Sequence, residues 1–148
     1  MGIVVTRPLN LTLGDVFDQL NLDDRGEHGK QAVLSGGPVS TQRGFVLHQS
    51  DSKWQSTIKV SDDIALTASR DIISALALGD GPDKALFALG YAGWGAGQLE
   101  SEISENSWLI VPADVNTLFN TAVDERWNAA TTLLGFDPHL IPLNPGHA

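Results

Sequence analysis

The first third of the chain alternates short apolar runs with polar segments, in a pattern that mixes strands with a helix. Residues 3–6 are apolar and β-branched and predict a strand, which Pro8 should end because proline donates no hydrogen bond to a ladder. Thr12, with an aspartate three residues on, predicts a helix over residues 13–20 whose apolar side chains share one face. The polar, glycine-containing residues 21–30 predict a surface loop.

The middle of the chain continues with short strands and one helix. Two apolar runs at residues 32–34 and 44–48 flank a glycine turn and predict a pair of strands. Residues 56–60 alternate as a half-buried strand does, and residues 64–67 form another short run, so these two predict a hairpin. Apolar residues at helical spacing over 70–78 predict a helix that a serine caps and a glycine ends.

The most strand-like stretch of the chain is residues 84–92. Its nearly continuous apolar run predicts burial on both faces and a central place in the sheet. A glycine-rich turn at residues 93–97 leads from it into a helix. Beyond that helix, residues 108–111 predict a strand, residues 114–119 a short helix, and the apolar spacing from 127 to 134 a last helix.

These elements together predict one domain, residues 1–148, of the mixed α+β class. No internal repeat, low-complexity tract or linker interrupts the chain. A domain of this length buries about 70% of the surface that its unfolded chain exposes, so a single core needs no further staple. The proline-containing tail at residues 138–145 is expected to be irregular.

Composition excludes several classes of chemistry. The chain has no cysteine, which rules out disulfides, a thiolate nucleophile and cysteine-ligated metals within it. Nine basic residues stand against 18 acidic ones, and the net charge of −9 opposes binding to nucleic acid and to anionic membrane surfaces. Neither a signal-peptide pattern nor an apolar stretch of membrane-spanning length is present in the sequence, so a cytoplasmic protein is expected.

Two glycine-rich turns are the first candidates for binding chemistry. Gly93 belongs to a G-x-G-x-G run before a helix, which lacks the spacing of a dinucleotide-binding turn and favours a tight strand-to-helix connection over a phosphate cradle. Gly36 and Gly37 could expose adjacent N–H groups to an anion, although a β-turn explains them more simply. No G-x-S-x-G motif occurs, so serine catalysis has no support.

Histidines and carboxylates offer weaker candidates. The four histidines show no spacing typical of a zinc site. His48 ends a predicted strand, where its ring either faces a pocket or makes an ordinary structural hydrogen bond. Six carboxylates lie between residues 100 and 125 with no basic residue among them, which favours a solvated face and leaves a metal or basic-partner site as the alternative. We therefore assign no metal, no cofactor and no catalytic residue.

Several motifs along the chain resemble those of one bacterial family, the YqgE/AlgH family. They are G-G-P-V at 36–39, G-F-V-L-H at 44–48, L-G-Y-A-G-W-G-A-G-Q-L-E at 89–100, G-H-A at 146–148, M-G-I-V-V-T-R-P at 1–8, Trp108 and E-R-W at 125–127. The resemblance covers essentially the whole chain, and the block at 89–100 is highly specific.

The resemblance implies an α/β fold with a branched, partly barrel-like sheet flanked by helices, in a cytosolic bacterial protein. It implies no chemistry, because the family is often labelled a transcriptional regulator without established catalytic, cofactor-binding or DNA-binding residues. Members usually carry further strand-forming sequence before the M-G-I-V segment. Without such strands, this chain is expected to expose a sheet edge and to be less stable or more prone to association than a longer form.

Two hypotheses about function follow. The first is a regulatory protein, more a binding protein than an enzyme, that acts through a protein or small-ligand partner and not by direct contact with nucleic acid or membrane. The alternative is a metabolite-binding domain or enzyme with a pocket bordered by the two glycine-rich turns. The sequence assigns neither the ligand nor the oligomeric state. The candidate ligand-binding residues are Arg7, Gly36, Gly37, His48, Tyr91, Gly93, Trp94, Gln98 and Glu102.

Direct DNA binding can be tested by titrating the protein with a fluorescent duplex and following anisotropy. We expect no tight binding, because the net charge of −9 repels phosphates and no basic helix is predicted. Tight binding that weakens steeply as salt is added would contradict this expectation.

Overall fold

The computed structural model describes residues 1–135, 137 and 140, and the closing G-H-A motif and nearly all of the predicted irregular tail lie outside these residues. The elements in chain order are β1 (Pro8–Thr12), α1 (Leu13–Gln19), β2 (Ala32–Ser35), β3 (Val39–Gln49), β4 (Thr57–Lys59), β5 (Ile64–Thr67), α2 (Arg70–Leu78), β6 (Ala85–Tyr91), α3 (Gln98–Ser104), α4 (Val115–Phe119), η1 (Val123–Glu125) and α5 (Arg126–Thr132). The mixed α+β class predicted from the sequence is confirmed. None of the described helices is long and apolar enough to cross a membrane.

The six strands form one mixed sheet in the order β1-β2-β6-β3-β5-β4. The β2–β6 pair is parallel and the other pairs are antiparallel. The prediction that residues 84–92 form a central strand is confirmed, because β6 lies between β2 and β3. The predicted hairpin is confirmed as β4 and β5. Among the described residues the sheet stays open, with β1 and β4 at its edges, and does not close into a barrel.

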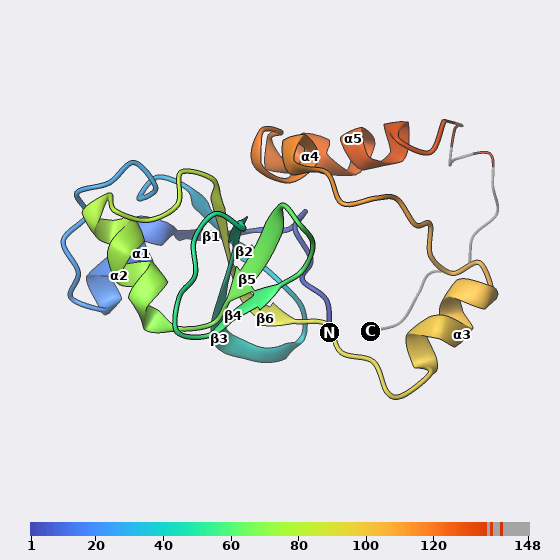
Figure 1. The fold of residues 1–148 in the computed structure, drawn as a ribbon, viewed down its shortest axis with the longest axis horizontal. Coiled ribbons are helices and arrows are strands. Elements are labelled where there is room, and N and C mark those ends of the chain that lie inside the picture. The colour runs from blue at the N-terminus through green and yellow to red at the C-terminus, as the bar shows by residue number, and fades with distance from the viewer. Residues whose placement is uncertain (136, 138–139, 141–148) are drawn as a thin grey trace.

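Side chains on alternate positions of β6 enter two separate apolar clusters. Ala85 and Phe87 point to the face that α1 and α2 cover, where Leu13, Phe17 and Ile72 pack. Leu86 and Ala88 point to the opposite face, where the cluster is completed by partly buried side chains of the N-terminal segment, α4 and η1. The sheet therefore lies between two layers, with α1 and α2 on one side and α4 and α5 on the other (Figure 1).

The bounds of the two helices on the first face follow the sequence prediction, but the predicted serine cap of α2 is not formed. Thr12 accepts a hydrogen bond from the Asp15 backbone N–H, and the Asp15 carboxylate accepts one from Thr12, so both members of the capping box are present. Gly79 ends α2 with a φ of 82°, a conformation that glycine adopts without strain. Ser69 occupies the N-cap position of α2 but donates its hydroxyl to Asp71 instead of accepting from the helix.

Two predicted strands are wrong. Residues 3–6 are not a strand, although Gly2 forms a bridge with Ala92 and Val4 donates to Gly36. Instead β1 begins at Pro8, which the edge position of the strand tolerates. Residues 108–111 also belong to no strand. No strand of the sheet pairs with them, and their apolar side chains lie beside α5 instead.

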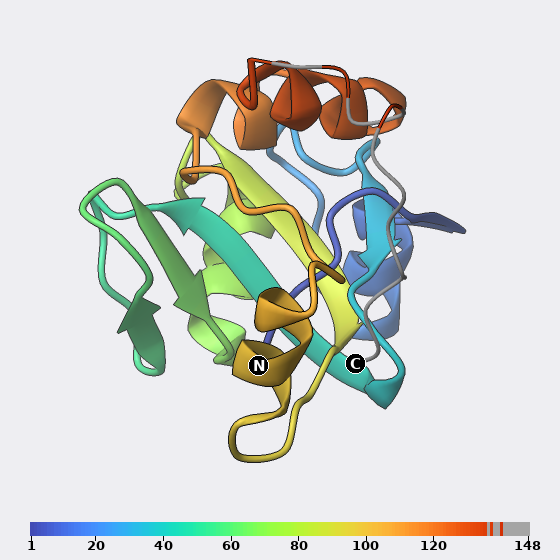
Figure 2. The ribbon, with the colours of Figure 1, turned by 90° about the vertical axis from the view of Figure 1, so that its right-hand side faces the viewer.

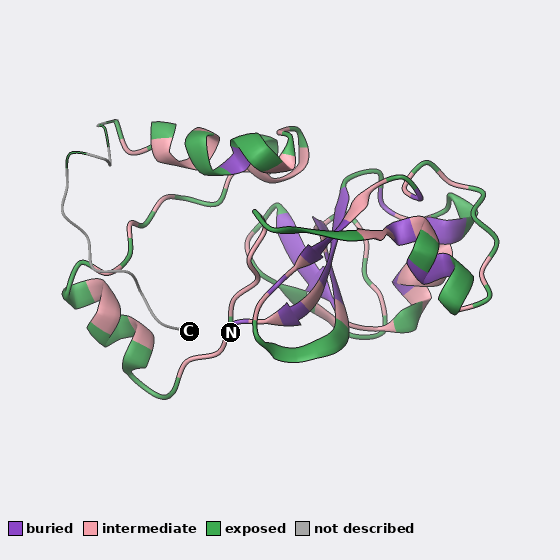
Figure 3. Cartoon of the chain, turned by 180° about the vertical axis from the view of Figure 1, so that it is seen from behind, coloured by how far each residue is buried: buried purple, intermediate pink, exposed green. Residues whose placement is uncertain are grey.

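Burial is unequal between the two covering layers. The buried residues gather in the strands and in α1 and α2, whereas α3, α4 and α5 are largely exposed (Figure 3). Neither α3 nor α4 contains a buried residue, and α5 buries only Arg126. Figure 2 looks onto this second face, with α4 and α5 lying along one end of the sheet. The second layer is thus the less tightly packed one.

The turn at Gly36 and Gly37 packs against the end of β6. A Cβ added to Gly36 would lie 2.3 Å from the Gly90 carbonyl oxygen, and one added to Gly37 would lie 2.1 Å from the Tyr91 carbonyl carbon. Real Cβ atoms do not approach backbone so closely, so these glycines permit the close packing of two backbones. The first glycine-rich turn therefore lies against Gly90 and Tyr91, which end β6 ahead of the second turn.

Replacing Gly36 with alanine should lower the free energy of unfolding by about 2 kcal/mol, because the contacted carbonyl belongs to a central strand and cannot rotate away. Urea unfolding measures the change. Gly95→Ala is the matched control, since its Cβ would meet no atom closer than the Gln98 Oε1 at 3.8 Å. Equal stability of the two variants would contradict the close approach.

Candidate ligand-binding groove

A groove runs along α5 on the second face of the molecule. We call residues 107–135 the C-terminal arm; its extended part, residues 107–114, lies beside α5 and forms the other wall. The groove consists of an upper hollow of about 310 Å³ and a lower hollow of about 250 Å³. Val111, Trp127 and Ala130 line both hollows, so the two adjoin each other.

The walls of the groove are mostly apolar. Leu109 and Leu134 line the upper hollow, and Val5, Leu118 and Leu133 line the lower one. Several apolar side chains of the arm are also exposed: Ile110 by 64%, Leu133 by 49% and Trp127 by 48%. An apolar surface in a hollow is the usual lining of a small-molecule site.

Local hydrogen bonds shape the lower hollow. Asp114 Oδ2 accepts from the Thr117 backbone N–H at 3.0 Å and from its hydroxyl at 2.8 Å, which caps α4. These bonds to Thr117 hold the pKa of the Asp114 carboxyl below its usual value. The capped turn redirects the chain from the extended part of the arm into α4, so the groove has a defined end.

Arg126 is the buried cation of this end. It exposes 8% of its surface and lines the lower hollow. Its Nη1 donates to the Val5 carbonyl oxygen at 2.7 Å, while its Nε is buried without a partner. No carboxylate of the described residues lies within ion-pairing distance of it. Burial lowers the pKa of the Arg126 guanidinium, yet arginine remains charged at neutral pH.

A hydrogen-bonded cluster supports the other end of the groove. Glu102 accepts from the indole N–H groups of Trp108 at 2.7 Å and Trp94 at 3.3 Å, and from the Gln98 amide at 3.1 Å. The two indoles pack edge to face with centroids 5.9 Å apart. Because Trp108 also lines the upper hollow, the Glu102 carboxylate positions one wall of the groove.

Three of the nine residues singled out from the sequence therefore lie together: Trp94, Gln98 and Glu102. Gly36 and Gly37 lie against the backbone of β6. A Cβ added to Gly93 would lie within 4 Å of the Tyr91 and Val39 side chains. Tyr91 packs edge to face on Phe45, with centroids 5.8 Å apart.

The remaining two residues lie elsewhere. Arg7 is exposed ahead of β1. His48 pairs with Ala85 at the opposite end of β6 from Tyr91, about 20 Å away at 3.3 Å per residue. The structure thus distributes the nine residues over several places, and a ligand-binding role for each stays a prediction.

The His48 ring makes structural hydrogen bonds, which is one of the two roles that its sequence position suggested. It is fully buried, with Nδ1 2.7 Å from the Gln49 carbonyl oxygen and Nε2 2.7 Å from the Thr67 hydroxyl. Since a carbonyl only accepts, Nδ1 carries a proton. The Thr67 hydroxyl lies 2.8 Å from that of Thr57, so a polar chain links three strands.

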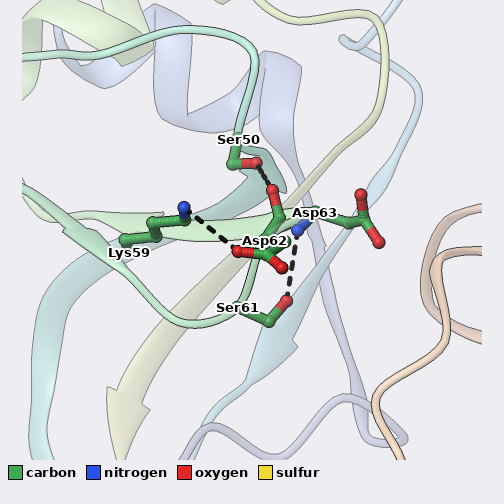
Figure 4. Close-up of polar contacts among 5 residues, drawn as sticks. All are labelled: Ser50, Lys59, Ser61, Asp62 and Asp63. Atoms are coloured by element: carbon green, nitrogen blue, oxygen red, sulfur yellow. Dashed lines mark hydrogen bonds and ion pairs between the residues drawn. The ribbon is translucent and has the colours of Figure 1, made fainter.

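Another hollow, separate from the groove and of about 320 Å³, lies beside the β4–β5 turn and is polar. Lys59 pairs with Asp62 at 3.3 Å, the Ser50 hydroxyl donates to the Asp62 carbonyl oxygen, and the Asp63 N–H donates to Ser61 (Figure 4). The paired side chains are 66% and 98% exposed, so water screens this ion pair. These bonds define a solvated turn.

The acidic stretch gathers no metal ligands in the part of the chain that the structure describes. No group of three or more histidine, aspartate or glutamate side chains is placed there to hold an ion. Glu102 is instead engaged by indoles and an amide, and Asp114 caps a helix. These two carboxylates have structural roles.

The sequence interpretation did not single out Arg126, Trp127 or Ala130 as site residues. One signal could have found Arg126: it is the first basic residue after Lys84, on an otherwise apolar helical face. Its burial could not have been found, because it depends on the arm lying against the Val5 backbone, 121 residues away in sequence.

Comparison with known proteins shows the family. The AlgH-like family model (DUF179) matches residues 1–139, and the chain belongs to this family. It is 57% identical over 148 residues to a UPF0301 protein of Saccharophagus degradans, covering 100% of this chain and 73% of that one. It is 50% identical over 149 residues to a UPF0301 protein of Xanthomonas campestris, with 100% and 79% covered. The family resemblance is confirmed.

Solved structures agree with the fold. The solution structure of the AlgH protein from Pseudomonas aeruginosa is similar with a TM-score of 0.76 and 45% identity, covering 100% of this chain and 79% of that one. A crystal structure of a protein from Corynebacterium diphtheriae shares the fold with a TM-score of 0.60 at 16% identity, covering 77% of this chain and 60% of that one.

Removing the Glu102 carboxylate should release the indole of Trp108. We expect Glu102→Ala to shift the indole N–H resonances of Trp94 and Trp108 in NMR spectra and to lower the free energy of unfolding by about 1–2 kcal/mol. Glu100→Ala is the matched control, since Glu100 is an exposed residue of the same helix. Unchanged indole signals in Glu102→Ala would contradict the described cluster.

Proposed function

We propose that this protein acts by binding a small ligand in the groove along α5, and that binding is regulatory. The observation that carries the proposal is the composition of the lower hollow. Val5 and Thr6 come from the N-terminal segment, whereas Thr117 and Leu133 come from the C-terminal arm. A ligand in this hollow contacts both parts of the chain at once.

Such a ligand would change how firmly the arm is attached. The arm meets the sheet through a small cluster, in which Phe119 and Val123 pack against Leu34, Leu86 and Ala88. A ligand that binds only the attached arm stabilises that arrangement by mass action. Bound and free protein would then present different surfaces to a partner, which is how a regulator without DNA contact of its own can act.

The volume of the groove favours a small molecule over a protein segment. The two hollows measure about 310 and 250 Å³, near the lower end of the range for small-ligand sites. Their shared wall at Trp127 and Ala130 lets one elongated apolar ligand occupy both. An elongated hydrocarbon is therefore the simplest probe.

The proposal can be tested with 1-octanol in an NMR titration of the full chain. We expect saturable shifts at Trp127, Ala130 and Leu133, with a Kd on the order of 1 mM, because nine heavy atoms at roughly 0.4 kcal/mol each give about 4 kcal/mol. Ala130→Phe should abolish the shifts, since Ala130 lines both hollows.

Asn128→Phe is the matched control, because Asn128 is exposed on the same helix and lines neither hollow. It should bind octanol as the wild type does. Shifts that never saturate, or that persist unchanged in Ala130→Phe, would contradict a ligand site in the groove. Binding of a folded protein partner that is insensitive to Ala130→Phe would likewise place the functional surface elsewhere.

A further inference from the structure

The lower hollow combines apolar walls with a guanidinium whose hydrogen-bonding capacity is largely unused. Arginine has five N–H donors. The described residues satisfy one nitrogen of Arg126, through the Val5 carbonyl oxygen, and leave Nε buried without a partner. A buried charge without a counter-ion is costly, so such groups are normally paired. Arg126 has no anionic partner among the described residues.

The other charged group lining the hollow does not supply that anion. Asp114 directs Oδ2 to the backbone N–H and hydroxyl of Thr117 and forms no contact within 4.0 Å of the Arg126 nitrogens. Its carboxylate is committed to capping α4. Asp114 therefore does not neutralise Arg126.

The geometry points to a small aliphatic monocarboxylic acid as the ligand: Arg126 would bind the carboxylate, and the apolar walls of the groove would cover the hydrocarbon tail. This inference rests on the proposed function and adds the class of ligand. Guanidinium and carboxylate match each other in shape and form charge-assisted hydrogen bonds, which are stronger inside a hollow than in water. One negative charge balances the one buried positive charge.

The size of the hollow supports an acid of moderate length. At about 250 Å³, the lower hollow holds roughly eight water molecules at 30 Å³ each. A carboxylate with a short chain fills it, and a longer tail continues past Trp127 into the upper hollow. A polypeptide C-terminus carries the same carboxylate but also backbone groups, for which the mostly apolar walls offer few partners.

The overall charge of the protein predicts a preference for cationic ligands, opposite to that expected from Arg126. With a net charge of −9, long-range attraction alone would favour cations and disfavour anions. Only a local cation inside the site reverses this order. Three probes with the same tail separate the two cases: octanoate, 1-octanol and octylammonium.

NMR titrations of the full chain at neutral pH and physiological salt should rank the probes octanoate, octanol, octylammonium. We expect octanoate to bind at least about tenfold more tightly than octanol, as charge-assisted hydrogen bonds require. Arg126→Met should bring the two affinities to within about twofold while octanol binding is retained. Arg126→Lys should keep part of the preference, because it keeps the charge without the planar fork.

The outcomes distinguish this inference from the proposed function. If octanol binds in the groove but octanoate binds no better, or if octylammonium binds most tightly, the carboxylate assignment is overturned and the groove remains. If none of the probes shifts Trp127 or Ala130, both fail. If Arg126→Met does not fold, the ranking of the three probes on the wild type decides alone.

A peptide arm tests the source of the carboxylate. N-acetyl-leucyl-leucine with a free carboxylate is compared with its C-terminal amide. Weaker binding of the free acid than of octanoate supports a small aliphatic acid. Tighter binding of the free acid than of octanoate, with loss of affinity in the amide, overturns that assignment in favour of a polypeptide C-terminus.

Discussion

The fold depends on one constraint: the central strand β6 has apolar side chains on both faces, and both must be covered. Phe87 on one face and Leu86 on the other each enter their own cluster. The helices α1 and α2 cover the first face; α1 follows β1 directly, and α2 begins shortly after β5. Neither of these helices covers the second face. The N-terminal segment and the C-terminal arm cover it instead.

This division explains why the candidate site lies on the second face. The arm crosses the sheet after the last strand and contacts it through few buried residues, which leaves hollows between α5 and the extended residues 107–114. A tightly packed layer such as α1 and α2 would leave none of this volume. Arg126 gives one end of this apolar groove a charge, and the Glu102 carboxylate holds the Trp108 wall at the other end.

Much of the fold was predictable because the relevant signals are local. The capping box at Thr12, the left-handed glycine at the end of α2 and the continuous apolar run of β6 each depend on neighbouring residues. Residues 3–6 and 108–111 were mispredicted as strands because an apolar run indicates burial, not a hydrogen-bonding partner. In the structure β1 occupies the edge of β2, and Ile3 and Val5 pack onto the face of the sheet instead.

The sequence by itself determined the mixed class, the central strand, most helix boundaries and the family, since propensity, capping and motif spacing are written in consecutive residues. Of the nine residues that it singled out, the structure brings Trp94, Gln98 and Glu102 together beside the groove, and these three lie within nine residues of one another in the chain. Only the tertiary structure decided that Arg126 is buried against the Val5 carbonyl and lines an apolar hollow. That contact joins the N-terminal segment to the C-terminal arm, and no local pattern of residues encodes which distant backbone a side chain will meet.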